Sequence, residues 1–275
     1  PNQAKVEAMG VALARRGPDG IGRYGAGDVS MIHRRLAVID LENGDQPLYE
    51  PGGAALIANA EVYNYVELRE EFGAAAFSTH SDCEPPLQVH RRHGVRFADY
   101  LRGMYAIALH DPAENRLLLS RDPFGIKPLY YAETPAGFAF ASEPQALIAA
   151  GLIEPRVDAA RRYELLQLQF STDAPTIYAG IHRLLPGETL VVTGGRIVER
   201  TRRAALPDVA PNGAAADETA GLKVLDTALR DSILVHQRSD VPYGMFLSGG
   251  VDSSVLLALM AEVNETPVRA FTAGF

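Results

Sequence analysis

Residues 241–260 read VPYGMFLSGGVDSSVLLALM, and this stretch decides the fold of the C-terminal part of the chain. The apolar run Pro242–Leu247 predicts a buried strand, the glycines that follow predict a tight turn, and Asp252–Val263 predicts a helix. A second apolar run, Val268–Phe275, predicts the next strand. Strand, turn, helix and strand in this order are typical of the opening of a parallel α/β sheet.

The turn in this stretch is a candidate anion site. Leu247 ends the strand, and Ser248-Gly249-Gly250-Val251-Asp252-Ser253-Ser254 follows it. Glycines let backbone N–H groups approach an anion, the helix N-terminus adds positive partial charge, and the serines can donate further hydrogen bonds. The turn also lies at the carboxyl edge of the predicted strands, where open α/β sheets bind their ligands.

The chemistry of this turn favours a pyrophosphate whose charge is shared with a metal ion. A Walker A loop would carry a Lys, and none is present here. Asp252 at the start of the helix can bind Mg²⁺. A plain strand–helix turn capped by serine is the structural alternative.

The motif SGGVDSS resembles the pyrophosphate-binding motif of ATP-pyrophosphatases, which cleave ATP between the α and β phosphates. The resemblance implies ATP and Mg²⁺ as cofactors and assigns Leu247 to Ser254 to the pyrophosphate. Ala273, on the next predicted strand, matches the adenine-side position of that family.

Upstream, the composition changes over Leu206–Asp217, whose sequence LPDVAPNGAAAD is small, Pro-rich and without periodicity. We therefore expect a first domain over 1–205, a linker over 206–217 and a second domain over 218–275. An amphipathic helix over Glu218–Gln237 opens the second domain. Its 58 residues (218–275) are too few for a doubly wound sheet, so we expect only its beginning here.

The first domain shows many short strand patterns accompanied by a few helices, which predicts an α+β domain of layered sheets covered by helices. The predicted strands are Val29–His33, Leu36–Asp40, Ala54–Ala58, Met104–Leu109, Arg116–Ser120, Pro128–Ala132, Gly137–Ala141 and a hairpin of Glu188–Val192 with Arg196–Thr201. The predicted helices are Asn2–Arg15, Tyr63–Phe72, Glu143–Ala150, Asp158–Phe170 and one that reaches His93, with Ser81 or Asp82 as its N-cap and Pro85 and Pro86 in its first turn.

Composition excludes several classes of protein. With 26 Lys and Arg against 34 Asp and Glu, the chain carries a net charge of −8, which argues against a nucleic-acid binder. No stretch approaches the roughly 18 apolar residues of a membrane span. A single cysteine, Cys83, excludes an intrachain disulfide and favours a reducing, cytoplasmic setting.

Six elements of the first domain resemble, in order and spacing, the class II glutamine amidotransferase domain of the glutamine-hydrolysing asparagine synthetase family. They are RGPD (16–19), HRRLAVID (33–40), NAEVYN (59–64), SDCE (81–84), RDPFGIKPLY (121–130) and FASE (140–143). The resemblance implies an N-terminal nucleophile hydrolase fold, followed by the start of an ATP-pyrophosphatase-type synthetase domain.

Glutamine hydrolysis needs groups for both charged ends of free glutamine and for an oxyanion. The resemblance assigns Arg35 to the carboxylate, which an Arg fork can bind bidentately, and Asp82 with Glu61 to the ammonium group. It assigns the Asn59 side chain and the N–H of Ala60 to the oxyanion. The structural alternative is that Arg35 and Asp82 form an ion pair and that Asn59 is a turn residue. The family usually has Gly at position 60, and Ala would resist a positive φ.

The nucleophile is the main departure from the family pattern. The family uses a cysteine at the mature N-terminus, activated by its own α-amine, whereas the printed sequence begins at Pro1. We expect the first strand and its cysteine to be either outside the printed sequence or absent from the protein. Cys83 lies near a helix start, which could lower its pKa, but it does not match the nucleophile position and is interpreted as a packing residue.

The leading hypothesis is an ATP-dependent carbon–nitrogen ligase that hydrolyses glutamine and amidates an adenylated aspartate to asparagine, releasing AMP and pyrophosphate. Its partners would be glutamine, aspartate and ATP, with a homodimer as one option. The printed chain alone would be incomplete for this reaction. The alternatives are a related ligase without glutaminase, similar to β-lactam synthetases, a ligase for another carboxylate, and a glutamine-sensing regulatory protein.

Overall fold

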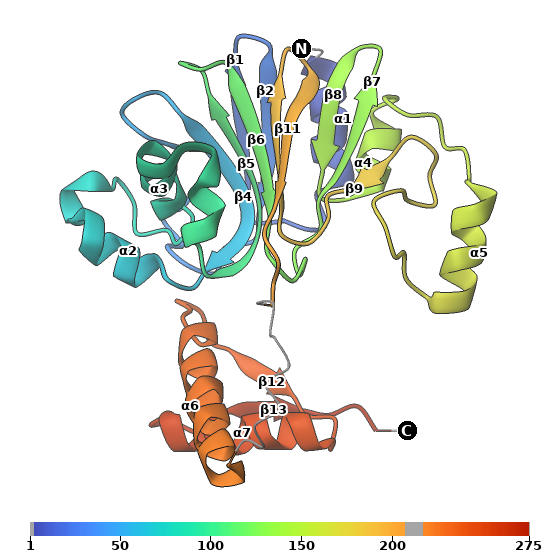
Figure 1. The fold of residues 1–275 in the computed structure, drawn as a ribbon. Helices are drawn as coiled ribbons and strands as arrows, with labels where there is room; N and C mark the ends of the chain where they lie inside the picture. The colour runs from blue at the N-terminus through green and yellow to red at the C-terminus, as the bar shows by residue number, and fades with distance from the viewer. Residues whose placement is uncertain (1–2, 207–216, 275) are drawn as a thin grey trace. The chain divides into compact units, whose positions relative to one another are not determined.

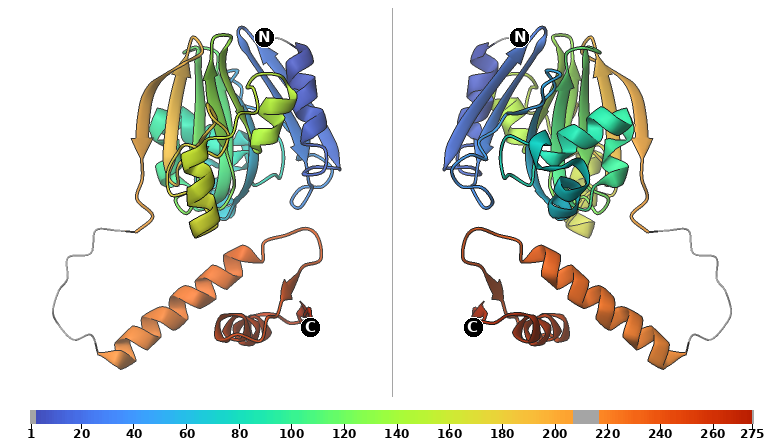
Figure 2. Two further views of the ribbon diagram at one scale, coloured as in Figure 1. Left: turned by 90° about the vertical axis from the view of Figure 1, so that its right-hand side faces the viewer. Right: turned by 90° about the vertical axis from the view of Figure 1, so that its left-hand side faces the viewer.

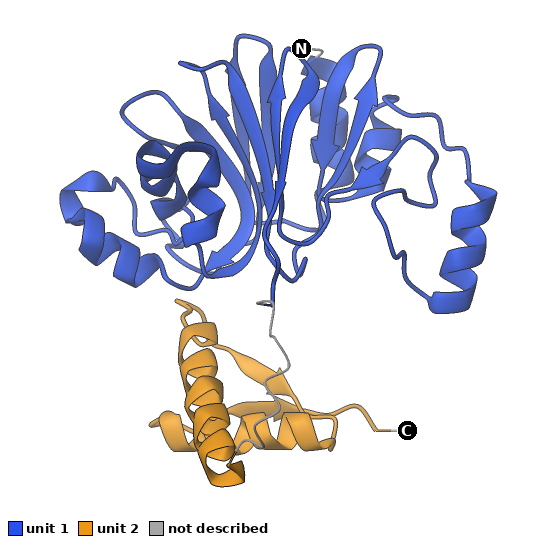
Figure 3. Cartoon of the chain, in the orientation of Figure 1, with its two compact units in different colours: residues 1–206 blue, residues 207–275 orange. Residues whose placement is uncertain are grey.

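The computed structural model describes residues 3–206 and 217–274, which fall into two compact units, Pro1–Leu206 and Pro207–Phe275 (Figure 3). The linker expected over 206–217 lies, apart from its two end residues, outside the described residues. Each unit is described by itself.

The first unit consists of short strands and helices in frequent alternation (Figure 1). In chain order they are α1 (Gln3–Ala12), β1 (Gly20–Ala26), β2 (Val29–Arg35), β3 (Leu48–Tyr49), β4 (Ala55–Val62), α2 (Tyr65–Phe72), the 3₁₀ turn η1 (Ala74–Ala76), α3 (Pro85–His93), the 3₁₀ segment η2 (Gly94–Tyr100), β5 (Gly103–Asp111), β6 (Arg116–Arg121), β7 (Tyr130–Thr134), β8 (Gly137–Ala141), α4 (Pro144–Ala149), α5 (Ala159–Leu168), β9 (His182–Arg183), β10 (Glu188–Thr193) and β11 (Arg196–Arg202).

These elements form four layers. A six-stranded antiparallel sheet has the order β11-β10-β6-β5-β4-β3. The helices α2 and α3 cover one face of this sheet, and two smaller sheets, β1-β2 and β8-β7-β9, pack on the other. The helices α1 and α4 cover the outer side of the smaller sheets (Figure 2). The predicted layered α+β fold of the first unit is thereby confirmed.

Strand β4 shows how the sequence produces these layers. Because side chains alternate across a strand, Leu56 and Ala58 enter the core beneath the helices, while Ala55 and Ile57 enter the core between the sheets. Both faces of the central strands are therefore buried, which explains their nearly continuous apolar sequences.

Two local predictions of the first unit were wrong, and strand β1 was missed. Leu36–Asp40 is not a strand, because the chain curls after β2 and Asp40 has a φ of 52°. Glu84, rather than Ser81 or Asp82, is the N-cap of α3, although both prolines lie in its first turn as predicted. Strand β1 was missed because three of its seven residues are glycine. Gly22 is required by packing, since a Cβ there would lie 1.6 Å from the backbone oxygen of Gln46.

The second unit begins as a parallel α/β structure. It contains α6 (Glu218–His236), β12 (Gly244–Phe246), α7 (Val251–Val263) and β13 (Arg269–Phe271). The two strands pair in parallel, which confirms the predicted strand–turn–helix–strand unit. Its small core gathers Ile233, Leu259 and Met260, while Phe246 stays 87% exposed.

Candidate functional site

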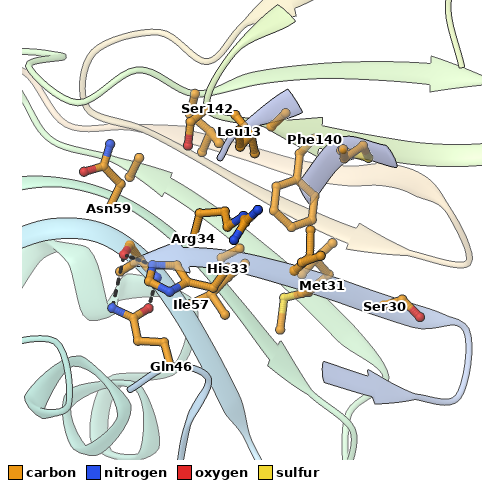
Figure 4. Close-up of a pocket in the computed structure, with 18 of the residues that line it drawn as sticks. Leu13, Ser30, Met31, His33, Arg34, Gln46, Ile57, Asn59, Phe140 and Ser142 are labelled. Carbon is orange, nitrogen blue, oxygen red and sulfur yellow. Dashed lines mark hydrogen bonds between the residues drawn. The ribbon is translucent and has the colours of Figure 1, made fainter. Parts of the chain in front are cut away.

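A cavity of about 790 Å³ lies within the first unit, between two strand edges. β2 is bonded on one side to β1, and β8 is bonded on one side to β7; residues of both strands line the cavity. Its floor is the inner face of the six-stranded sheet and includes Ile57, Ala106 and Ala108. In Figure 4, Asn59 lies toward one end of the cavity and Ser30 toward the other.

We call the end of the cavity at Asn59 its polar end. The backbone of β4 supplies an open N–H there. Along the β4 edge that faces away from β5, successive even-numbered residues meet different partners. Ala54 and Leu56 pair with the β3 segment, and the N–H of Ala58 donates to Gln46 Oε1 at 2.6 Å. The N–H of Val62 donates to Asp82 Oδ2 at 2.8 Å.

Ala60 falls between these two positions, so strand alternation directs its N–H to the same edge, and Ala60 lines the cavity. No acceptor for this N–H is found among the residues that the structure describes. Its φ lies outside the positive region, so the alanine fits a backbone that needs no glycine. Asn59 shares a face of β4 with Ile57, which points its amide between the sheets beside that N–H. The two donors suit an oxyanion.

Two carboxylates adjoin these donors. Glu61 lies two residues beyond Asn59 on the same face of β4, and Lys127 approaches it to 3.5 Å. Asp82 is only 5% exposed. Burial raises the pKa of Asp82 to about 6, and the charge of Glu61 raises it further, against the lowering effect of the Val62 N–H. Burial and the charge of Glu61 disfavour the ionised form of Asp82, so a bound cation such as an ammonium group would stabilise that form.

We expect Asp82→Asn to stabilise the first unit at pH 8. The folded pKa, about 6, exceeds the ordinary 3.8, so the folded state holds the proton more tightly. The free energy of unfolding therefore falls as pH rises from the ordinary pKa of 3.8 through the folded pKa of about 6. Well above pH 6 the loss reaches about 3 kcal/mol by linkage. The amide removes the penalty while its oxygen can still accept the Val62 N–H. Denaturant unfolding at pH 4 and pH 8 measures the difference.

The control for this prediction is Asp28→Asn, which changes an exposed carboxylate between β1 and β2. It should shift stability little at either pH. An equal gain from Asp82→Asn at both pH values would contradict the prediction, because only an ionised Asp82 carries the penalty.

Arg35 lines the cavity, but its guanidinium is engaged by the loop that follows β2. It donates to Asp45 Oδ1 at 2.9 Å and to the carbonyl oxygens of residues 39, 40 and 41. Arg35 is 7% exposed, whereas the side chain of Asp45 is 77% exposed. The carboxylate of a bound ligand would therefore compete with the carboxylate of Asp45 for one edge of the Arg35 guanidinium. Arg35 and Asp82 both line the cavity.

Cys83 is buried in the core beneath the helices. Burial raises the pKa of its thiol well above the ordinary value, and the neighbouring Asp82 carboxylate raises it further. A thiol with a raised pKa is a poor nucleophile at neutral pH. This agrees with its interpretation as a packing residue rather than as a thiol activated by a helix start.

In the second unit, the turn after β12 lies next to the end of β13. The N–H of Leu247 donates to the Phe271 carbonyl, and Thr272 Oγ1 donates to the Leu247 carbonyl, both at 2.8 Å. Ala273 follows directly, so it lies at the same sheet edge as the turn. Gly249 has a φ of 80°, a conformation that favours glycine.

The helix start at this turn is available to an anion. Gly250 is the N-cap of α7 and provides no side-chain cap, so the first-turn N–H groups point toward solvent. The hydroxyls of Ser253 and Ser254 donate to the Gly250 carbonyl, at 3.2 and 2.8 Å. Asp252 is exposed in the first helical turn. No group of three or more metal-ligating side chains occurs within residues 3–206 and 217–274.

Gln46 was missed in the sequence analysis, and His33 was quoted only as part of the motif HRRLAVID, without a role. Gln46 and His33 both contact the backbone of Ala58, immediately before Asn59 (Figure 4). Nothing in their local sequence marks these contacts, because they come from a loop and from another sheet. Lys127 was quoted within a motif, but its pairing with Glu61 is a tertiary contact.

The layered fold of the first unit has a counterpart among solved structures. Glutamine phosphoribosylpyrophosphate amidotransferase from Bacillus subtilis in complex with ADP and GMP is similar in fold to this chain, with a TM-score of 0.50. The two are 17% identical in sequence, and the match covers 94% of this chain and 62% of that one.

Residues 1–202 match the glutamine amidotransferase domain family, and the chain belongs to this family. Residues 224–275 match the asparagine synthase family. The chain is 38% identical to glutamine-hydrolyzing asparagine synthetase 1 of Bacillus subtilis, over 98% of this chain and 42% of that protein. It is 34% identical to asparagine synthetase B of Escherichia coli, over 90% of this chain and 40% of that protein. The chain thus spans less than half the length of these curated relatives.

A membrane-spanning helix was not expected from the sequence. Within the described part of the chain, no helix is both long and apolar enough to cross a bilayer.

Proposed function

We propose that the complete natural protein is a glutamine-dependent, ATP-driven ligase that converts aspartate to asparagine. The first unit would release ammonia from glutamine, and the second would activate aspartate with ATP. The observation that carries this proposal is the polar end of the cavity. There the Asn59 amide, the open N–H of Ala60 and the carboxylates of Glu61 and Asp82 adjoin one another. The similarity to glutamine-hydrolyzing asparagine synthetases supports it.

The nucleophile is proposed to be a cysteine at the start of an additional strand that fills the cavity. Two features support this: β2 and β8 both turn an edge toward the cavity, and its floor is apolar like the core between two sheets. A strand bonded to both edges would unite the two smaller sheets into one layer. Its end at Asn59 would hold the thiol beside the oxyanion donors.

The proposed glutaminase reaction then follows from the site. The α-amine of the cysteine takes the thiol proton, and the sulfur attacks the side-chain carbonyl carbon of glutamine. Asn59 and Ala60 donate to the oxyanion, the carbon–nitrogen bond breaks, and the nitrogen leaves as ammonia with the proton. Water hydrolyses the thioester to glutamate. Glu61 and Asp82 would hold the α-ammonium group, and Arg35 the α-carboxylate.

In the second unit, residues Leu247 to Ser254 are proposed to hold the pyrophosphate of ATP, with Ala273 on the adenine side. The β-carboxylate of aspartate would attack the α-phosphorus, forming aspartyl-AMP and releasing pyrophosphate. Ammonia would then attack the acyl carbon and displace AMP. Mg²⁺ would neutralise phosphate charge, and Asp252 is the carboxylate available to hold it together with phosphate oxygens. One carboxylate suffices for a metal that shares its ligands with a nucleotide.

The complete protein tests this proposal. We expect it to release glutamate from glutamine, to lose that activity when its N-terminal cysteine becomes alanine, and to show aspartate-dependent ATP–pyrophosphate exchange. Ligase activity with ammonia but without glutamate release would favour the alternative that resembles β-lactam synthetases. Exchange with another carboxylate only would replace aspartate as the acceptor. Glutamine binding without either reaction would favour a sensing protein.

We also include a homodimer and a cytoplasmic location in the proposal. Light scattering on the purified protein tests the first, and cell fractionation tests the second.

A further inference from the structure

The peptide of Ala58 is held by two side chains from outside its own sheet. Gln46 Oε1 accepts the Ala58 N–H at 2.6 Å, and Gln46 Nε2 donates to the Ala58 carbonyl at 3.2 Å. His33 Nε2 donates to the same carbonyl at 3.1 Å (Figure 4). We call this set of contacts the Ala58 clamp.

The clamp continues the hydrogen-bond ladder of β3 with a side chain. Glu50, just after β3, donates its N–H to the Ala54 carbonyl, and in the ladder between β3 and β4 the paired residues of β4 are Ala55 and Leu56. Two residues further on, the primary amide of Gln46 presents one donor and one acceptor to Ala58, as a backbone peptide would. The next position on this edge is the open N–H of Ala60. Gln46 therefore fills the last position before the proposed oxyanion site.

Both clamp residues are held firmly. Gln46 is 9% exposed, and its backbone oxygen packs against Gly22, where a Cβ would come within 1.6 Å. His33 is half-buried on β2. Burial lowers the pKa of His33 to about 4, so the ring is neutral at pH 7, and its bond to a carbonyl places the proton on Nε2.

The hydrogen bond of His33 to the Ala58 carbonyl leaves the other ring nitrogen of His33 unsatisfied within the described part of the chain. Its Nδ1 is buried and has no hydrogen-bond partner among the described residues. A buried polar atom without a hydrogen-bond partner destabilises the folded state. An apolar residue at position 33 would avoid this cost but would lose the donor to the Ala58 carbonyl.

We propose that Gln46 and His33 are positioning residues for glutamine hydrolysis, which fix the Ala58 peptide and through it the oxyanion donors of Asn59 and Ala60. This inference rests on the proposed glutaminase function. Among the described residues, the hydrogen bonds of these two side chains go to Ala58 and not to Arg35, Glu61 or Asp82, so the clamp should affect the transition state more than glutamine binding. Misplacing a catalytic group by about 1 Å can cost about 10²-fold in rate.

The test uses Gln46→Met in the complete natural protein, which keeps the shape of the side chain but removes both hydrogen bonds. We expect glutaminase kcat to fall about 10²-fold while KM for glutamine changes less than about threefold. Ammonia-dependent amide formation should be unchanged. The matched control is Gln88→Met, because Gln88 is equally buried and donates to the Ala76 carbonyl at 3.0 Å, away from β4.

A pair of His33 variants gives a second test that does not depend on Gln46→Met folding. In His33→Gln the amide nitrogen can reach the position of Nε2, so kcat should recover to within about threefold of the parent. His33→Phe retains a ring without a donor and should lose about tenfold or more, as expected for one buried hydrogen bond. Equal kcat for the two variants would overturn the role of His33.

Hydrogen exchange separates this inference from the proposed function. Gln46→Met should speed amide exchange in the β4 peptide that contains Asn59 and Ala60 about tenfold, whereas Gln88→Met should not. If the parent releases no glutamate, the proposed function fails, and exchange still decides whether the clamp holds β4. Unchanged exchange, or a rise in KM equal to the fall in kcat, would overturn the inference.

Discussion

Replacing Asn59 by alanine is expected to lower the glutaminase kcat of the complete protein by about 10²–10³-fold, the effect of removing one oxyanion donor. The amide is one of two donors at the polar end of the cavity, beside the N–H of Ala60. KM for glutamine should change little, because Glu61 and Asp82, proposed to hold the ammonium group, are untouched. Glutamate release under saturating glutamine measures the loss.

Two controls define the result. Asn43→Ala removes an exposed amide from the loop after β2 and should leave kcat unchanged. Ammonia-dependent amide formation by Asn59→Ala should equal that of the parent, since free ammonia bypasses glutamine hydrolysis. An equal loss of the glutamine- and ammonia-dependent reactions would mean that Asn59 supports the fold rather than the oxyanion.

The second large effect is expected from Asp252→Asn in the turn after β12. The amide keeps the size of the side chain but removes the negative charge that a hard cation such as Mg²⁺ prefers. We expect ATP–pyrophosphate exchange with aspartate to fall about 10²-fold or more, because charge neutralisation on the phosphates would be lost. Glutamate release from glutamine should persist, since the residues proposed for glutamine hydrolysis all belong to the first unit.

Glu265→Gln is the matched control, because it removes an exposed carboxylate from the same unit, at the far end of α7. Exchange should be unaffected by it. If Asp252→Asn retained full exchange at limiting Mg²⁺, Asp252 would be only a first-turn acid that interacts with the helix dipole.

Much of the fold could be predicted from local patterns. The hairpin of β10 and β11, the antiparallel central strands and the parallel pair of β12 and β13 all follow apolar periodicity and turn residues. Patterns failed where tertiary contacts override them. The residues after Arg35 are apolar enough for a strand, yet they form a loop whose carbonyl oxygens accept hydrogen bonds from the Arg35 guanidinium. β1 is too rich in glycine to resemble a strand, yet Gly22 is needed against Gln46.

The candidate site could be predicted as a set of residues but not as a geometry. Arg35, Asn59, Ala60, Glu61 and Asp82 all line one cavity, and their motifs identified them. The engagement of Arg35 by Asp45, the pairing of Glu61 with Lys127 and the pKa of Asp82 depend on neighbours distant in the chain. Their assigned roles stay predictions until the variants are measured.

The sequence by itself determined the class of most segments, because apolar spacing and turn residues act over a few positions. It also determined which residue types were available for chemistry. Only the tertiary structure decided that the β2 and β8 edges face one cavity, that Ala60 presents an open N–H there, and that Gln46 and His33 hold the peptide before it. The reason is physical: hydrogen bonding across sheets and burial of charge depend on distances between residues that local sequence does not encode.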